Sequence, residues 1–233
     1  MTTILVIEDD KHIAELIAIN LEDDLTKVHC CHNGTEGFIE ATNNAYDLII
    51  LDLMLPGKKG MDICRDLRTN NSSIPILMLT SKSDEIDKIL GLEMGADDYI
   101  TKPFSVREFQ ARVKAILRRS KLDAERSNPI IAPELRFHKL IINQELRKVE
   151  NNSQRLNLTP KEFELLSLMA NNPGKTYSRA QLLHKIWGYD FEGYEHTVNS
   201  HINRLRAKIE KDAGNPEYIL TTWGIGYRFT ESL

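Results

Sequence analysis

The feature that most constrains the fold of this chain is a regular alternation over its first half. Short apolar, β-branched runs recur at Ile4–Ile7, Lys27–Cys30, Leu48–Leu51, Ile76–Leu79 and Tyr99–Ile100. The longer segments between these runs space their apolar residues at helical intervals. Strands that alternate with helices predict an α/β domain, in which a five-stranded doubly wound parallel sheet is covered by helices on both faces.

Composition places the chain among ordinary globular proteins. Its 233 residues are 41% apolar and 27% charged, which is enough for one large core or two small ones. No apolar run approaches about 18 residues, and the N-terminus enters TILVI without an export signal. Three cysteines are an odd number and do not suggest a disulfide framework. We therefore expect a cytoplasmic protein without membrane insertion.

Polar residues stand at the carboxyl ends of the predicted strands. Glu8 and Asp9 follow the first strand, Asp52 ends the third, Thr80 ends the fourth, and Lys102 follows the fifth. In a parallel sheet these ends meet at one edge, where ligands bind. Clustered carboxylates repel one another, and a hard cation such as Mg²⁺ or Mn²⁺ relieves that repulsion. The lysine and the hydroxyl add what an incoming phosphoryl group needs.

Four motifs in order, ILVIEDD, LIILDLMLPGKKGMD, PILMLTS and GADDYITKPF, resemble the receiver domain of two-component response regulators over about residues 2–119. The resemblance implies a flavodoxin-like fold in which Asp52 accepts a phosphoryl group from a sensor histidine kinase. Thr80 and Lys102 would contact that group. Taken alone, an Asp at a strand end is more often a helix cap, and a Thr there is more often a strand former.

The resemblance also implies a metal site and a switch. Direct or water-mediated ligands would be Glu8, Asp9, Asp52 and the backbone carbonyl of Leu53. Thr80 and Tyr99 would shift together on phosphorylation, and the Lys102–Pro103 peptide would be cis. Asp10 has a second interpretation as the cap of the first helix.

Net charge and a polar, proline-containing segment divide the chain into two predicted domains. Residues 1–119 carry a net charge of −6 and residues 132–233 a net charge of +2, within a total of −4. Between them the apolar period stops, polar residues take over, and Pro129 and Pro133 follow. We expect a receiver domain at 1–119, a linker at 120–131 and an effector domain at 132–233.

Complementary charges lie on the predicted fourth and fifth helices of the receiver. They are compatible with ordinary intrachain surface pairs. Through its second half the chain also resembles one subfamily of these response regulators, and this resemblance instead implies a two-fold homodimer after phosphorylation. In that dimer Lys88 would pair with Glu108, and Asp98 with Arg112, across chains. The interface expected on this basis comprises Lys88, Ile89, Leu92, Asp97, Asp98, Glu108, Ala111 and Arg112.

The second half reads as a small α+β domain with a basic third helix. Residues 135–158 alternate as an antiparallel meander, and two helices follow, capped by Thr159 and Ser178. In the third helix, 197–211, Val198, Ile202, Leu205 and Ile209 form a buried stripe. We expect His201, Arg204 and Lys208 on the opposite, exposed face. We expect a hairpin with Gly224 and Gly226 at its turn to follow, which places Trp223 on a wing.

A basic helix face alone is more often a solvated surface than a DNA-binding one. However, LTPKEFELL, SRAQLL, HTVNSHINRLRAKIE and TTWGIGYRF resemble the winged-helix effector of the OmpR/PhoB subfamily over about residues 133–231. The resemblance implies binding to double-stranded promoter DNA, and the loop Tyr189–Glu195 would face RNA polymerase. The contacts it implies are Thr197, His201, Asn203, Arg204 and Arg206 on the helix, with Thr222 and Trp223 on the wing.

The function predicted from the sequence is therefore a phosphorylation-activated transcriptional regulator, not an enzyme, that dimerises and binds tandem half-sites. The main alternative is a phosphorylation-independent DNA-binding regulator whose receiver is a static dimer. An aspartyl-phosphate hydrolase typically has a second acid where this chain has Met54, and no cap domain is visible. An effector that binds protein instead of DNA is the remaining alternative.

Overall fold

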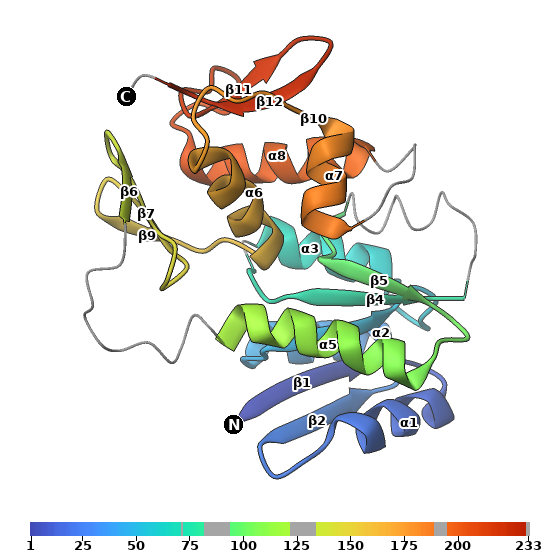
Figure 1. Ribbon diagram of the computed structural model, residues 1–233. Coiled ribbons are helices and arrows are strands. Elements are labelled where there is room, and N and C mark those ends of the chain that lie inside the picture. Colours follow the sequence, from blue (N-terminus) through green and yellow to red (C-terminus); the bar gives the residue numbers. More distant parts are fainter. Residues whose placement is uncertain (71, 82–93, 122–133, 189–194, 232–233) are drawn as a thin grey trace. The chain divides into compact units, whose positions relative to one another are not determined.

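The computed structural model describes residues 1–70, 72–81, 94–121, 134–188 and 195–231 (Figure 1). They form two compact units, Met1–Arg118 and Arg119–Leu233. Helix α5 (Val106–Lys121) continues two residues past the expected domain end at 119. The rest of the predicted linker lies outside the described residues.

The first unit contains the predicted five-stranded parallel sheet. Its strands β1 to β5 follow the order β2-β1-β3-β4-β5, and all neighbouring pairs are parallel. The central strands β3 and β4 are buried at every residue, as expected for a sheet covered on both faces. The strand bounds are β1 (Thr2–Ile7), β2 (Thr26–Cys31), β3 (Leu48–Asp52), β4 (Ile76–Thr80) and β5 (Asp98–Thr101).

Helices cover both faces of the first unit's sheet (Figure 1). Because side chains alternate along each strand, the core is divided between these two faces. On one face Ile4, Leu48 and Leu77 pack with α1 (Lys11–Leu21) and α5, through residues such as Ile17 and Phe109. On the other, Ile7 touches α2 (Gly34–Asn43) so closely that a Cβ on Gly37 would lie 2.6 Å from Ile7. The third helix of the unit is α3 (Gly60–Thr69). The predicted fourth helix falls outside the described residues.

A buried ion pair joins α3 to the start of β5. Arg68 donates from Nη2 to Asp97 Oδ2 at 3.0 Å and from Nε to the Gly95 carbonyl at 2.9 Å. The same Asp97 oxygen accepts the backbone N–H of Ile76 at 2.9 Å. Asp97 is 1% exposed. Its predicted place at a dimer surface is therefore wrong, because this carboxylate is an internal acceptor.

We expect Arg68→Ala to lower the free energy of unfolding of the receiver by about 3–5 kcal/mol, because it leaves Asp97 buried without its cation. Urea denaturation followed by circular dichroism measures the change. The matched control is Arg65→Ala on the same helix, whose partners Asp62 and Asp66 are exposed or half-buried, and which should cost less than about 1 kcal/mol. Equal losses in both variants would contradict a structural role for the buried pair.

The second unit has the predicted meander followed by three helices and a hairpin. The meander strands β6 to β9 pair antiparallel in chain order. A further three-stranded sheet has the order β10-β12-β11. The bounds are β6 (Glu134–Phe137), β7 (Leu140–Asn143), β8 (Lys148–Asn151), β9 (Gln154–Leu156), α6 (Pro160–Ala170), β10 (Tyr177–Ser178), α7 (Arg179–Trp187), α8 (Glu195–Ile209), β11 (Ile219–Thr222) and β12 (Gly226–Phe229).

Local signals in the sequence set the ends of these helices. Thr159 and Ser178 both form the reciprocal hydrogen bonds of a capping box, with Glu162 and Gln181 as partners. Gly188 ends α7 in the left-handed conformation, with φ of 79°. The caps expected at Thr159 and Ser178 are thus confirmed.

The short strand β10 was not predicted, and its position changes the structural role assigned to Gly226. This residue was predicted in the hairpin turn, but it lies in β12 opposite Ser178. A Cβ there would lie 2.0 Å from the Tyr177 carbonyl oxygen, so the close approach of β10 requires glycine. Gly224 does occupy the turn, with φ of 75°.

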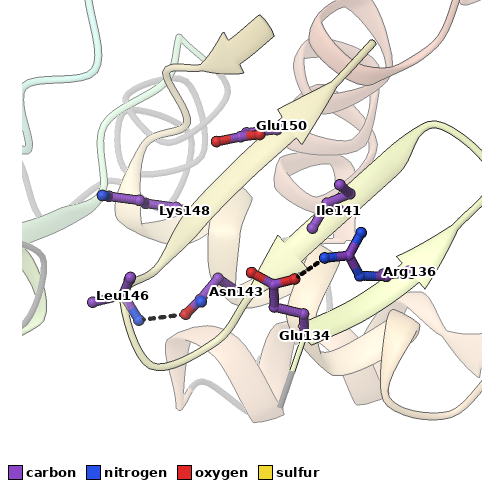
Figure 2. A pocket seen from close by; sticks show the side chains of 7 residues that line it. All are labelled: Glu134, Arg136, Ile141, Asn143, Leu146, Lys148 and Glu150. Carbon is purple, nitrogen blue, oxygen red and sulfur yellow. Dashed lines mark hydrogen bonds and ion pairs between the residues drawn. The ribbon is translucent and has the colours of Figure 1, made fainter. Parts of the chain in front are cut away.

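The outward face of the meander carries mixed charges (Figure 2). Glu134 and Arg136 form an ion pair of 2.5 Å on β6, and Asn143 accepts the backbone N–H of Leu146 at 2.8 Å. The lining residues of this pocket are Glu134, Arg136, Ile141, Asn143, Leu146, Lys148 and Glu150. Both signs of charge are present in equal number, so the pocket does not select one kind of ion.

Candidate functional site

An acidic pocket lies at the carboxyl end of the receiver sheet. Glu8 and Asp9 directly follow β1, and Asp52 is the last residue of the neighbouring strand β3. The chain order of the strands reverses between β1 and β3, which is where doubly wound sheets bind ligands. One carboxylate oxygen from each of these three residues lies within 4.8 Å of the other two. It is the one such group of potential metal ligands found in the described ranges.

Lys102 lies between two of these carboxylates. Its Nζ donates to Glu8 Oε2 and to Asp52 Oδ2, each at 2.6 Å. The side chains of Glu8 and Asp52 are 0% and 6% exposed, and that of Lys102 is 14% exposed. The Lys102–Pro103 peptide is cis, as the resemblance implied. A single ammonium therefore bridges the two most deeply buried acids of the pocket.

The electrostatics of the pocket follow from this burial. The pKa of Glu8 is raised to about 7, chiefly because burial disfavours its charged form; the hydrogen bond from Lys102 opposes this rise and the nearby charge of Asp52 adds to it. Desolvation alone lowers the pKa of Lys102, but its hydrogen bonds to Asp52 and Glu8 outweigh it and hold that pKa above the ordinary value. At neutral pH Lys102 thus stays charged and offsets the acids.

The donor set fits a hard divalent cation. Three carboxylates converge, and hard cations of the Mg²⁺ and Mn²⁺ type prefer oxygen ligands. The Leu53 carbonyl accepts the Gly60 N–H at 3.1 Å and keeps a second lone pair. Asp10 instead caps α1, because its Oδ1 accepts from the backbone N–H groups of His12 and Ile13 at 2.9 and 3.3 Å.

Thr80 and Tyr99 lie on the two strands beside the pocket. Thr80 ends β4, is 1% exposed, and accepts the Lys102 backbone N–H on its carbonyl at 2.7 Å. Tyr99 lies on β5 opposite Met78 and is half-buried. The sheet therefore brings Thr80 to the same edge as Asp52.

We expect Lys102→Met to lower the free energy of unfolding by about 3 kcal/mol without metal, because Glu8 and Asp52 lose their buried cation. Added Mg²⁺ should stabilise the variant more than the native protein, because the ammonium no longer opposes the metal. Chemical unfolding with and without Mg²⁺ measures both effects. The exposed Lys114 on α5 supplies the control, Lys114→Met, and an equal response to Mg²⁺ in all three proteins would contradict the expectation.

Three of the charged residues predicted to bridge two receivers, Asp98, Glu108 and Arg112, are paired within one chain. Arg112 donates from Nη1 to Asp98 Oδ2 at 3.0 Å and from Nη2 to Glu108 Oε1 at 2.9 Å. Ala111 beside them is exposed. The remaining predicted interface residues, Lys88, Ile89 and Leu92, lie outside the described residues.

Helix α8 buries more of its surface than the sequence suggested. The predicted apolar stripe is confirmed, since Val198, Ile202, Leu205 and Ile209 are each 0% exposed. However, Thr197, His201 and Arg206 are only 0%, 1% and 8% exposed. The expectation that His201 lies on the exposed face is therefore wrong, and the side chains of Thr197 and Arg206 do not face solvent either.

Contacts with α7 and the hairpin explain this burial. The His201 ring packs edge-on against Trp187, with 4.9 Å between ring centroids. Arg206 donates twice to the Ile219 carbonyl, at 3.0 and 2.6 Å, and once to Thr221 Oγ1 at 2.8 Å. These side chains join α8 to α7 and to the hairpin, so their contacts lie within the domain.

A different set of residues forms the outward sector of α8. Asn203 is exposed and Arg204 is half-buried, with its Nη2 3.2 Å from His201 Nδ1. Lys208, expected on the basic face, donates to Glu162 at 2.7 Å. The sequence interpretation placed Ser200 beside this face, where it is half-buried, but it missed His196, Asn199 and Ala207, which are exposed or half-buried. The spacing 196, 200, 203, 207 was the available signal, because it lies opposite the apolar stripe.

The hairpin β11–β12 presents an apolar tip. Trp223 is 89% exposed and Ile225 is 55% exposed, while Thr222 at the end of β11 is half-buried. Large apolar side chains this exposed are candidates for contact with a partner molecule. None of the helices in the described ranges has the length and apolar content needed to cross a bilayer.

Comparisons with known proteins match both units. Residues 4–114 match the family model of the response regulator receiver domain, and residues 153–229 match that of the C-terminal domain of transcriptional regulatory proteins. The chain is similar to DrrB, an OmpR/PhoB homologue of Thermotoga maritima, with 35% identity, 99% of each chain covered and a TM-score of 0.50. It is also similar to two mutants of RitR, each at 26% identity with both chains fully covered, with TM-scores of 0.67 and 0.68.

Proposed function

The chain belongs to the OmpR/PhoB response regulators, so it is a phosphorylation-regulated transcription regulator, and from this premise we propose which residues carry each step. Its receiver domain implies a sensor histidine kinase as partner, and its effector domain implies DNA. We propose Asp52 as the phosphoacceptor. The observation that carries this proposal is the contact of Asp52 with Lys102 beside the carboxylates of Glu8 and Asp9.

In the proposed reaction, a carboxylate oxygen of Asp52 attacks the phosphorus atom of the kinase phosphohistidine, and the imidazole nitrogen leaves. Lys102 already lies 2.6 Å from Asp52 and can pair with a phosphoryl oxygen there. The hydroxyl of Thr80 supplies a hydrogen bond. Glu8, Asp9, Asp52 and the Leu53 carbonyl would hold a Mg²⁺ or Mn²⁺ ion, which would supply neutralising charge for the phosphoryl oxygens.

Phosphorylation is proposed to act through Thr80 and Tyr99 on the surface of β5 and α5. Arg112 there exchanges its intrachain partners, Asp98 and Glu108, for those of a second receiver. Because the intrachain bonds are only partly buried, such an exchange costs little. The result is a homodimer around Ala111, to which the surface containing Lys88, Ile89 and Leu92 contributes.

The dimer is proposed to place two effectors on tandem half-sites. Asn203 and Arg204 of α8 enter the major groove, and Thr222 and Trp223 of the hairpin contact the adjacent backbone or minor groove. The two effectors bind more tightly together because the first contact raises the effective concentration of the second. The loop at 189–195, of which only Glu195 lies within the described residues, is proposed to contact RNA polymerase.

We expect Asp52→Asn to abolish the dimer that beryllium fluoride and Mg²⁺ induce in the native protein. The variant should also lose the gain in affinity for promoter DNA that dimerisation produces. This gain should be at least tenfold, because linking two binding sites raises affinity by roughly 10² or more. Size-exclusion chromatography with light scattering measures the dimer, and retention of fragmented genomic DNA measures binding. The control is Asp62→Asn, a more exposed acid on α3.

Each outcome of this experiment points to a different function. Enrichment of direct repeats only in the activated native protein supports the proposal. Equal enrichment with and without activation would make the receiver a static dimerisation module, and retention of no DNA would indicate an effector that binds protein.

We expect Arg204→Ala to weaken binding of the selected DNA by about 1–3 kcal/mol if Arg204 reads a base. In that case the loss of affinity should depend on one base pair, and replacing that base pair should weaken DNA binding by the native protein to the same extent. A loss that is uniform across DNA sequences would assign Arg204 to a phosphate. Competition binding at fixed salt measures the loss of affinity. The charge-matched control is Arg155→Ala, at an exposed position on β9.

A further inference from the structure

Asn199 occupies the outward sector of α8 but is held from two sides by the rest of the effector. It lies one turn before Asn203 and one turn after His196, both of which are exposed. Arg179 at the start of α7 and Tyr227 on β12 both contact its side chain. Asn199 is therefore the point at which the two helices and the hairpin meet beside the surface proposed to face DNA.

These contacts fix the orientation of the Asn199 amide. Arg179 Nε lies 2.9 Å from one terminal atom of the amide, and Tyr227 OH lies 2.8 Å from the same atom. Because a guanidinium can only donate, that atom must be the oxygen Oδ1. A flipped amide would place its NH2 group against the N–H donor of Arg179 and lose that bond. Oδ1 thus accepts two hydrogen bonds from within the domain.

The amide nitrogen Nδ2 makes no hydrogen bond to any residue in the described ranges. It is also not fully buried, because it is absent from the buried polar atoms without a partner in those ranges. Two N–H donors therefore remain accessible on the outward sector of α8, on a side chain whose rotation is restrained. Restraint of this kind reduces the entropy lost when the donors meet a ligand.

We propose that Asn199 is a specificity-determining residue that reads a guanine in the major groove by donation from Nδ2. An unrestrained asparagine selects adenine, because it accepts from N6 while it donates to N7. Here Oδ1 is already occupied, so only donation is possible. Guanine alone presents two acceptors, O6 and N7, to the two N–H donors of Nδ2; adenine presents N7 beside an amino donor, thymine presents O4 beside its methyl group, and cytosine presents an amino donor. This inference rests on the proposed DNA-binding function and specifies one of its contacts.

Asn199→Asp is the discriminating variant. An aspartate can still accept from Arg179 and Tyr227, so the junction of helices and hairpin is retained, but the outward atom becomes an acceptor. The full chain, activated with beryllium fluoride and Mg²⁺, is used to select from a pool of duplexes with randomised sequence. We expect the native protein to select guanine at one position of each half-site, and the variant to lose that preference by about five- to tenfold while the other positions stay unchanged.

A second measurement uses the native protein alone and so does not depend on how the variant folds. Replacing the selected guanine with 7-deazaguanine removes the N7 acceptor and should weaken binding several-fold. The same replacement at another guanine of the duplex, outside the half-sites, is the control. Tyr227→Phe should keep the guanine preference, since Arg179 still orients Oδ1.

The outcomes separate this inference from the function on which it depends. If the native protein enriches a sequence and Asn199→Asp enriches the same one with the same preference at every position, Asn199 has only a structural role and the inference is wrong. Insensitivity to 7-deazaguanine at every half-site guanine would also overturn it. If the native protein enriches no duplex, the proposed DNA-binding function fails as well.

Discussion

The contact of Lys102 with Glu8 and Asp52 is the interaction on which the receiver depends. Two acids that are almost inaccessible to solvent would each carry a large desolvation cost if they were charged and unpaired. The parallel sheet makes this arrangement unavoidable, because it brings the ends of β1, β3 and β5 to one edge. One ammonium reduces the repulsion in the pocket, and in the proposed function the same ammonium pairs with the phosphoryl group. Stability and the proposed reactivity would therefore depend on one cation.

The strand ends and their polar residues could be predicted because both follow from local pattern. The apolar runs predict β1 and β3, and the topology rule for parallel sheets then places Glu8 beside Asp52 without knowledge of any long-range contact. Asp97 could not be predicted in this way. Its partner Arg68 lies 29 positions earlier on a different element, and nothing in the spacing of either residue indicates that they meet inside the protein.

The same limit explains the errors on α8. Periodicity predicted the stripe from Val198 to Ile209 correctly, since that stripe depends on the helix alone. The burial of His201 depends on Trp187 of α7, and that of Arg206 depends on the β11 carbonyl of Ile219. A helix enclosed by a second helix and a hairpin buries a wider sector than its apolar residues mark, and polar side chains with internal partners occupy the additional part.

This use of cations within the domain changes how the effector should recognise DNA. Arg206 and Lys208 donate to the Ile219 carbonyl and to Glu162, and burial lowers the pKa of Arg206 even though the guanidinium stays charged. The outward sector of α8 is left with Arg204 and neutral groups such as Asn199 and Asn203. Few cations on that sector would leave few phosphate contacts through α8, and few such contacts mean a weak salt dependence and a modest contribution of this helix to affinity. In the proposed function, the gain from joining two effectors would then contribute strongly to promoter occupancy, and receiver pairing would control it.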